Sequence, residues 1–331
     1  MERASLHLDP YLHDPERWGV SLAQMTELMI PCLDAARAQT VVEVGAFAGD
    51  LTRVLVDWAS SRDARLLAID PAPQHDLVEL ARESSTLELD RRTSLEALPD
   101  VPRPDALIID GDHNYYTVSR ELALIEQAAP GLDFPLLVLH DVCWPHGRRD
   151  DYFDASLIPE SARHAVTGSA GGIYPGDPGV RPDGLPYPRS AAREGGAGNG
   201  VLTAVEDFVA SRDHLRLVVV PAFFGMGVVW HRQAPWADEV AEILAPWDRH
   251  PILQRLEENR VRQLAERHAR SVEVWRLQAR ISRQQAVLER VLRSRAFALA
   301  EQLSRTRVRA GVARDQPAVS RDLIRRALDD Q

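Results

Sequence analysis

Residues 40–50 read TVVEVGAFAGD, and this stretch decides the fold class. A short apolar run at 40–44 enters a turn that contains Gly45 and Gly49, and an amphipathic stretch follows at 51–60. A glycine turn between a buried strand and a helix is typical of open α/β sheets, where ligands approach the backbone at the carboxyl ends of the strands. We therefore expect a first strand at 40–44 with a ligand site at its tip.

The alternation of short apolar runs and longer amphipathic stretches continues to about residue 140, as expected for a parallel sheet with crossover helices. The predicted strands are 40–44, 65–69, 106–109 and 135–139, with a weaker one at 86–89, and the predicted helices are 51–60, 74–84 and 115–128. After a helix at 201–211, two close apolar runs predict an antiparallel hairpin at 215–220 and 225–230. The fold class is α/β: a doubly wound, Rossmann-like sheet with a terminal antiparallel strand and a C-terminal helical extension.

Residues 171–200 contain nine glycines and five prolines, which is too many for a helix or a central strand. We expect a loop here. Long loops in compact domains are often active-site lids, and this one follows the stretch of the chain that is richest in polar motifs. A lid and a plain connector both remain open at this point.

From residue 251 to about 310 the sequence is rich in Arg, Glu and Gln, with apolar residues at partly heptad-like spacing. This pattern predicts a long helix or a helical hairpin. We expect copies of the chain to associate through these helices into a homo-oligomer. The predicted organisation is an N-terminal helical segment at 1–34, the α/β domain at 35–235, the helices at 251–310 and a tail at 311–331.

The chain has 331 residues, of which 45% are hydrophobic, and a formal net charge of −10. From Gln254 onward 18 basic and 10 acidic residues give +8, whereas the first 253 residues carry −18. Interleaved acids and few aromatics in the basic part argue against a nucleic-acid partner. Every basic residue is arginine, so Schiff-base chemistry and a phosphate-loop lysine are excluded.

Cys32 and Cys143 match no zinc or redox spacing, and we expect both to be reduced core thiols. The first ten residues, MERASLHLDP, lack the apolar core of a signal peptide, and no run approaches membrane-spanning length. We expect a cytoplasmic protein without membrane contact.

The turn after the first predicted strand carries the first candidate site residues. Phe47 stands where a dinucleotide-binding turn has its second glycine, which disfavours nicotinamide chemistry. Glu43 precedes Gly45 by two residues and suits a ligand with an amino group. Asp70 follows the second predicted strand and can accept hydrogen bonds from both hydroxyls of a ribose.

The fourth and fifth predicted strands both end in polar residues, Ile109-Asp110-Gly111-Asp112-His113 and Leu139-His140-Asp141. Neighbouring strands lie about 4.8 Å apart, so Asp110 and Asp141 can converge on one cation, for which their hard oxygens favour Mg²⁺ or Mn²⁺. His140 is compatible with a softer ion but does not require one. The alternative is that these acids cap strand ends and helix N-termini, above all Asp112, which can point away.

His113 is placed three residues after Asp110, where it can remove a proton from a substrate hydroxyl with a pKa already near the working pH. A purely structural histidine is the alternative. Residues 143–152 are rich in groups that stack on sugar faces or bind hydroxyls, which predicts either an ordinary polar loop or an acceptor-binding wall made by Trp144, His146, Arg148 and Tyr152.

Two resemblances emerge from these motifs. The E-x-G-x-x-x-G pattern at 43–49 resembles class I S-adenosylmethionine-dependent methyltransferases, which implies cofactor binding by Glu43, Gly45, Ala46, Gly49, Asp70 and Asp110. The I-D-G-D-H-x-Y and L-H-D-V motifs are similar to those of metal-dependent O-methyltransferases that modify macrolide sugars, such as the macrocin and mycinamicin enzymes. That resemblance covers residues 35–235 and implies a general base at His113 and metal ligands at Asp110, His140 and Asp141. This chain departs from the family pattern at His140, which stands where the family has an acidic residue.

The sequence thus predicts an S-adenosylmethionine-dependent, metal-assisted O-methyltransferase whose small-molecule acceptor is a hydroxyl of a sugar or glycosylated natural product. One alternative is a metal-independent methyltransferase in which His113 alone is the base. A metal hydrolase would need further ligands, for which His146, His164, His214 and His231 show no motif context. A non-enzymatic assembly protein on the same fold would be expected to lose Glu43, Asp70 or Asp110, and all three are present.

Overall fold

The structure is a computed structural model that describes residues 21–169, 171–312 and 320–329. These residues form two compact units that divide between Glu266 and Arg267. Most of the segment predicted at 1–34 lies outside the described residues; within its remainder, the first helix, α1, spans Thr26–Ala35.

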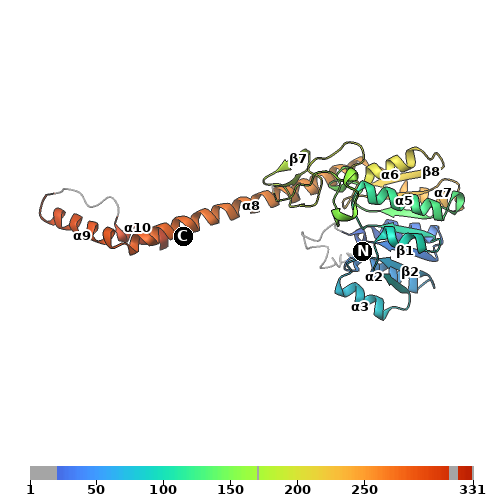
Figure 1. Ribbon diagram of the computed structural model, residues 1–331, viewed down its shortest axis with the longest axis horizontal. Helices are drawn as coiled ribbons and strands as arrows, with labels where there is room; N and C mark the ends of the chain where they lie inside the picture. Colours follow the sequence, from blue (N-terminus) through green and yellow to red (C-terminus); the bar gives the residue numbers. More distant parts are fainter. Residues whose placement is uncertain (1–20, 170, 313–319, 330–331) are drawn as a thin grey trace, which may run out of the picture. The chain divides into compact units, whose positions relative to one another are not determined.

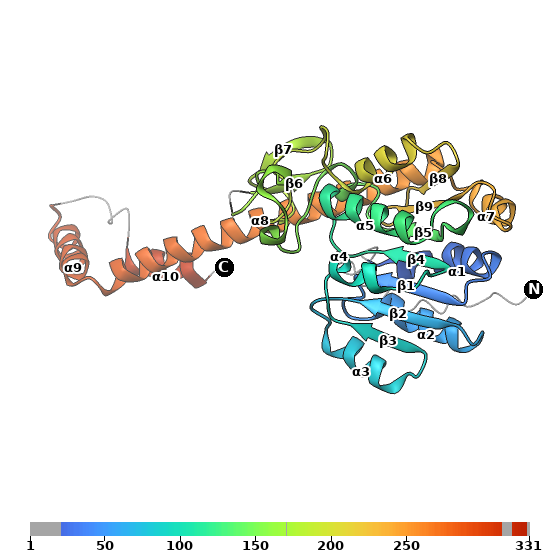
Figure 2. The same ribbon diagram turned by 45° about the vertical axis from the view of Figure 1, so that its right-hand side comes forward.

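The first unit is built on a seven-stranded sheet with the order β3-β2-β1-β4-β5-β9-β8. The first five strands are parallel, and β9 runs antiparallel to both of its neighbours, β5 and β8. The predicted α/β fold with one antiparallel strand is therefore confirmed (Figure 2). The strand bounds are β1 Thr40–Val44, β2 Arg65–Ile69, β3 Leu87–Asp90, β4 Ala106–Ile109, β5 Leu136–Leu139, β8 Leu215–Val220 and β9 Met226–His231.

Helices cover both faces of this sheet, so each face has its own hydrophobic core. One core packs under α1, α2, α3 and α7, and the other under α4, α5 and α6, of which the last two lie side by side (Figure 1). The remaining helix bounds in this unit are α2 Asp50–Ser60, α3 His75–Glu83, α4 Ser94–Ala97, α5 Tyr115–Ala128, α6 Val201–Ala210 and α7 Ala237–Leu244. Short 3₁₀ turns lie at Leu22–Met25, Leu98–Asp100, Gly131–Asp133, His146–Arg148, Ala155–Leu157 and Glu160–Ala162.

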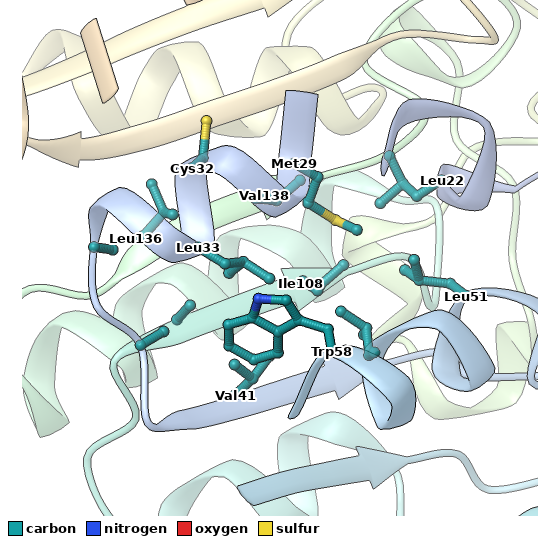
Figure 3. Packing of buried hydrophobic residues seen from close by; sticks show 14 of the residues in the cluster. Leu22, Met29, Cys32, Leu33, Val41, Leu51, Trp58, Ile108, Leu136 and Val138 are labelled. Atoms are coloured by element: carbon teal, nitrogen blue, oxygen red, sulfur yellow. The ribbon is translucent and has the colours of Figure 1, made fainter. Parts of the chain in front are cut away.

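Trp58 on α2 shows how α1 is held against the sheet. Figure 3 shows its ring lying between Leu33 of α1 and Val41 of β1. The indole Nε1 donates a hydrogen bond of 2.8 Å to Asp34 Oδ1, so the polar edge of the ring is paired while its body is buried. Cys32 is buried in the same core, and both cysteines are free thiols.

The structure differs from the sequence-based expectations in several places. The glycine-rich segment 171–200 holds a two-stranded antiparallel sheet, β6 Gly172–Tyr174 and β7 Asp177–Arg181, because a two-stranded ribbon tolerates glycine and proline better than a central strand does. Helices α4 and α7 were not predicted. The C-terminal region contains α8 Pro251–Arg293 and α9 Arg295–Arg309, and the expected tail includes a further helix, α10 Arg321–Asp329. None of the helices described here is both long and apolar enough to cross a membrane.

Candidate active site

The turn after β1 is held by the carboxylate of Asp70 at the tip of β2. Its Oδ2 accepts a 2.6 Å hydrogen bond from the Phe47 amide, and its Oδ1 accepts a 2.8 Å bond from the Ala72 amide. Phe47 itself has a φ of 44° and a side chain that is 64% exposed. Asp70 therefore fixes the backbone of the turn, and each of its oxygens keeps a further lone pair for a ligand.

Gly45 is required at this turn by a close backbone approach. Its φ is +86°, and a Cβ built on it would lie 2.1 Å from the carbonyl oxygen of Asp110. The missing side chain thus allows the turn to pack on the end of β4. Gly49, with a φ of +84°, begins α2 in a left-handed conformation.

Glu43, Asp70 and Asp110 bring three carboxylates to the carboxyl ends of three neighbouring strands, β1, β2 and β4. Glu43 is 2% exposed, and its Oε2 has no hydrogen-bond partner among the described residues. Burial, with repulsion from Asp110 and Asp70, raises the pKa of Glu43 to about 8. A positively charged ligand would stabilise the ionised forms of these three carboxyl groups.

Asp110, His140 and Asp141 come together at the tips of β4 and β5, as the sequence predicts. His140 Nδ1 lies 3.1 Å from Asp110 Oδ1 and 3.5 Å from Asp141 Oδ2. Its other nitrogen, Nε2, lies 2.8 Å from the carbonyl oxygen of Phe223, which can only accept a hydrogen bond. Burial alone would lower the pKa of His140, but the charges of Asp110 and Asp141 raise it to about 9. In the neutral ring that could bind a cation, Nε2 keeps its proton and the lone pair of Nδ1 faces the two carboxylates.

His113 lies against this cluster. Its Nε2 is 3.1 Å from Asp141 Oδ2 and 3.5 Å from Asp110 Oδ1. Burial alone would lower the pKa of His113, but the charges of Asp141 and Asp110 outweigh it and raise the pKa to about 10. The expectation of a pKa near neutrality is therefore wrong for the protein without a bound cation.

Asp112 points away from the cluster, which was the alternative left open by the sequence. Its Oδ2 accepts a hydrogen bond from the Thr117 hydroxyl, and its Oδ1 accepts one from the Phe153 amide. Asn114 caps α5 through a 2.8 Å bond from the Thr117 amide. Asp112 thus joins the start of α5 to the loop that follows β5.

The structure places the four residues of the predicted acceptor wall in different surroundings. Tyr152 is fully buried, and its hydroxyl donates to Asp150 Oδ2 while accepting from the His164 amide, so it cannot reach an acceptor. Arg148 is bound to α6 through Glu206 and Thr203. Trp144 and His146 remain, each with a buried ring nitrogen that has no partner among the described residues, Nε1 and Nδ1 respectively.

Asp150 was not singled out from the sequence, although it organises the loop. Its Oδ1 accepts hydrogen bonds from the Tyr115 amide at the start of α5 and from the Gly200 amide before α6. Its own amide donates 2.7 Å to Asn199 Oδ1. The only sequence signal was its place within the polar run 146–152.

Comparisons with known proteins found one family model and several solved structures to which this chain is similar. Residues 42–142, about a third of the chain, match the family model of a methyltransferase domain, whereas no curated protein matches. Among solved structures, the chain is 13% identical to an SAH-bound Podospora anserina methyltransferase, with 62% of this chain and 77% of that one covered and a TM-score of 0.38. A putative O-methyltransferase from Klebsiella pneumoniae is 15% identical, with 69% and 92% covered and a TM-score of 0.35. The family match confirms the prediction of a methyltransferase.

Proposed function

We propose that this chain is an S-adenosylmethionine-dependent, metal-assisted O-methyltransferase that acts on a hydroxyl of a sugar or glycosylated natural product. The observation that carries the proposal is the position of His113. It lies 3.5 Å from Asp110 and 3.1 Å from Asp141, between the three-carboxylate end of the sheet and the loop that bears Trp144 and His146.

The donor side of the site suits a ligand that carries positive charge and a ribose. Asp70 and Asp110 supply negative charge at the ends of their strands, a positively charged ligand would favour the ionised form of Glu43 beside them, and the backbone of Gly45, Ala46 and Gly49 forms the turn between them. S-adenosylmethionine supplies, when bound, a methyl group on a cationic sulfur. The buried, unpaired Oε2 of Glu43 supports this fit, because an unpaired buried polar atom is costly unless a ligand completes its bonds.

The cluster of Asp110, His140 and Asp141 fits a divalent cation. Each residue offers one ligand atom, and these atoms lie within 4.8 Å of one another. Mg²⁺ or Mn²⁺ held there would supply positive charge that makes a nearby hydroxyl more acidic. It would also oppose the carboxylate charges that keep His113 protonated, so that Nε2 of the neutral ring could accept the hydroxyl proton.

The acceptor side combines aromatic rings with polar atoms that have no hydrogen-bond partner among the described residues. Trp144 and His146 follow β5 directly, and the edge of Tyr187 meets the His146 ring at a centroid distance of 5.3 Å. Aromatic faces next to unpaired donors and acceptors suit a polyhydroxylated molecule.

The test is methyl transfer from S-adenosylmethionine to a panel of glycosides, with Mg²⁺ and with EDTA, in wild type and His113→Gln. We expect transfer that His113→Gln lowers at least a hundredfold, because general bases contribute about 10²–10⁴ in rate. Transfer that EDTA leaves unchanged would favour the metal-independent alternative. If no acceptor is methylated although the donor binds, the sugar assignment fails.

We also propose that the C-terminal helices join copies of the chain. Val274, Leu277 and Ile281 on α8 are 52%, 50% and 42% exposed and follow a heptad spacing. Leu277→Glu should lower the mass measured by light scattering, whereas Arg283→Glu, at an exposed position outside the heptad interface, should not. An unchanged mass in Leu277→Glu would contradict this.

A further inference from the structure

A second group of metal-ligating side chains lies beside the cluster already described. His113, His146 and Asp151 each offer one ligand atom, and these atoms lie within 4.8 Å of one another. The His113 and His146 rings have centroids 5.1 Å apart and planes inclined by 12°. The proposed function uses His113 as the base and places His146 on the acceptor side, but it gives Asp151 no role and does not explain why these three side chains converge.

His146 points to a ligand independently of that convergence. It is 5% exposed, and its Nδ1 is buried without a hydrogen-bond partner among the described residues. Burial lowers the pKa of His146 to about 4, so the ring is neutral at neutral pH and has a lone pair to offer. Leaving such an atom unpaired destabilises the folded state, and a bound cation would offset this cost.

The loop around the three residues is built to hold them in place. The Asp151 amide donates 2.9 Å to the carbonyl oxygen of His113, and the Ser190 hydroxyl donates 2.7 Å to Asp151 Oδ1. Oδ1 is thereby oriented, and the carboxylate keeps Oδ2 for another partner. The Tyr187 ring packs against the His146 ring, with centroids 5.3 Å apart and planes inclined by 75°.

We infer that His113, His146 and Asp151 form a second cation site, which takes a divalent transition metal such as Zn²⁺. Two imidazoles and one carboxylate favour such borderline ions, whereas the two carboxylates of the first cluster favour Mg²⁺ or Mn²⁺. Ligands of a tetrahedral zinc ion lie about 3.4 Å apart. The ligand atoms lie within 4.8 Å of one another, so any pair needs to close by at most about 1.4 Å.

His113 borders both clusters, which gives the second site a consequence. A zinc ion bound to the His113 ring makes that ring a weaker base, so Zn²⁺ should inhibit methyl transfer; this consequence, unlike the binding itself, rests on the proposed function. The second site would thus make the enzyme sensitive to the free concentration of transition metal.

The experiment titrates Zn²⁺ and, separately, Mg²⁺ into the full-length, chelator-stripped protein by calorimetry. We compare wild type with His146→Gln and Asp151→Asn, and use His75→Gln, an exposed histidine on α3, as the matched control. Each test variant should weaken Zn²⁺ binding at least tenfold and leave Mg²⁺ binding unchanged, while the control matches wild type. Circular dichroism verifies the fold of each variant.

A measurement on wild type alone keeps the inference testable if a variant does not fold. Co²⁺ in place of Zn²⁺ should give visible absorption bands of the intensity typical of low-coordinate nitrogen ligation, and Zn²⁺ should abolish them. Zn²⁺ binding that is equal in wild type and both variants, or that Asp141→Asn removes and His146→Gln does not, would overturn the second site. Neither result depends on methyl transfer, so the two proposals fail separately.

Discussion

His140 Nε2 lies 2.8 Å from the carbonyl oxygen of Phe223, in the turn between β8 and β9. Glu257 of α8 holds this turn in place, because its carboxylate accepts hydrogen bonds from the Phe223 and Phe224 amides. Phe223 and Phe224 have φ values of 52° and 65°, a region that costs a non-glycine residue about 1 kcal/mol or more. A residue more than a hundred positions away in sequence thus orients the imidazole of the predicted metal cluster.

Glu257→Gln should therefore weaken the turn between β8 and β9 that holds His140. The amide side chain has one acceptor oxygen in place of two, so one backbone N–H loses its partner at a cost of about 1–3 kcal/mol in the free energy of unfolding. We expect Mg²⁺ affinity to fall at least threefold as well, measured by calorimetry alongside urea denaturation. Glu258→Gln, on the exposed side of the same helix, is the control and should behave as wild type. Loss of stability with unchanged Mg²⁺ affinity would show that Glu257 does not position His140.

Gly45→Ala tests the close approach of the first turn to β4. Its Cβ would lie 2.1 Å from the Asp110 carbonyl oxygen, so backbone must shift in addition to the strain of a φ of +86°. Gly176→Ala is the matched control, because its φ is +84° and nothing lies within 4 Å of its Cβ. The control should lose about 1–2 kcal/mol in the free energy of unfolding and Gly45→Ala clearly more. Equal losses in urea denaturation would mean that only the dihedral angle matters.

Glu121 on α5 predicts a pH dependence of stability. It is fully buried, and burial raises its pKa to about 8, whereas a glutamate in the unfolded chain has a pKa of about 4.3. Between these values the folded state holds a proton that the unfolded state has released, so this group lowers the free energy of unfolding as pH rises.

Glu121→Gln should remove this fall in the free energy of unfolding with rising pH. Relative to wild type, its free energy of unfolding should rise between pH 5 and pH 8 in urea denaturation, with no comparable change for the exposed control Glu83→Gln. If wild type and Glu121→Gln keep a constant difference across that range, the buried carboxyl does not titrate as described.

Much of the fold was predictable because buried strands and amphipathic helices repeat a local pattern. The strands at 40–44, 65–69, 106–109 and 215–220 have the predicted bounds, and so does helix α5. The strand tips also brought Asp110 next to His140 and Asp141, since adjacent parallel strands end at the same edge.

The loop residues were harder to place, because burial in a loop leaves no periodic signal in the sequence. Tyr152 looked like a sugar-binding ring, yet it is fully buried and shares its hydroxyl with Asp150. Glu257 lies in an Arg-rich helix whose pattern suggested solvent exposure, although it is 8% exposed. Both depend on partners far away in the chain, which a local pattern cannot indicate.

The central claim, a donor site at the tips of β1 and β2, is tested most directly by calorimetric titration of S-adenosylhomocysteine into the full-length protein. Wild type should bind with micromolar-class affinity, and Asp70→Ala should weaken binding at least tenfold. Asp76→Ala, an exposed acid on α3, should bind as wild type does. Absence of binding to wild type, or equal affinity in wild type and folded Asp70→Ala, would contradict the account.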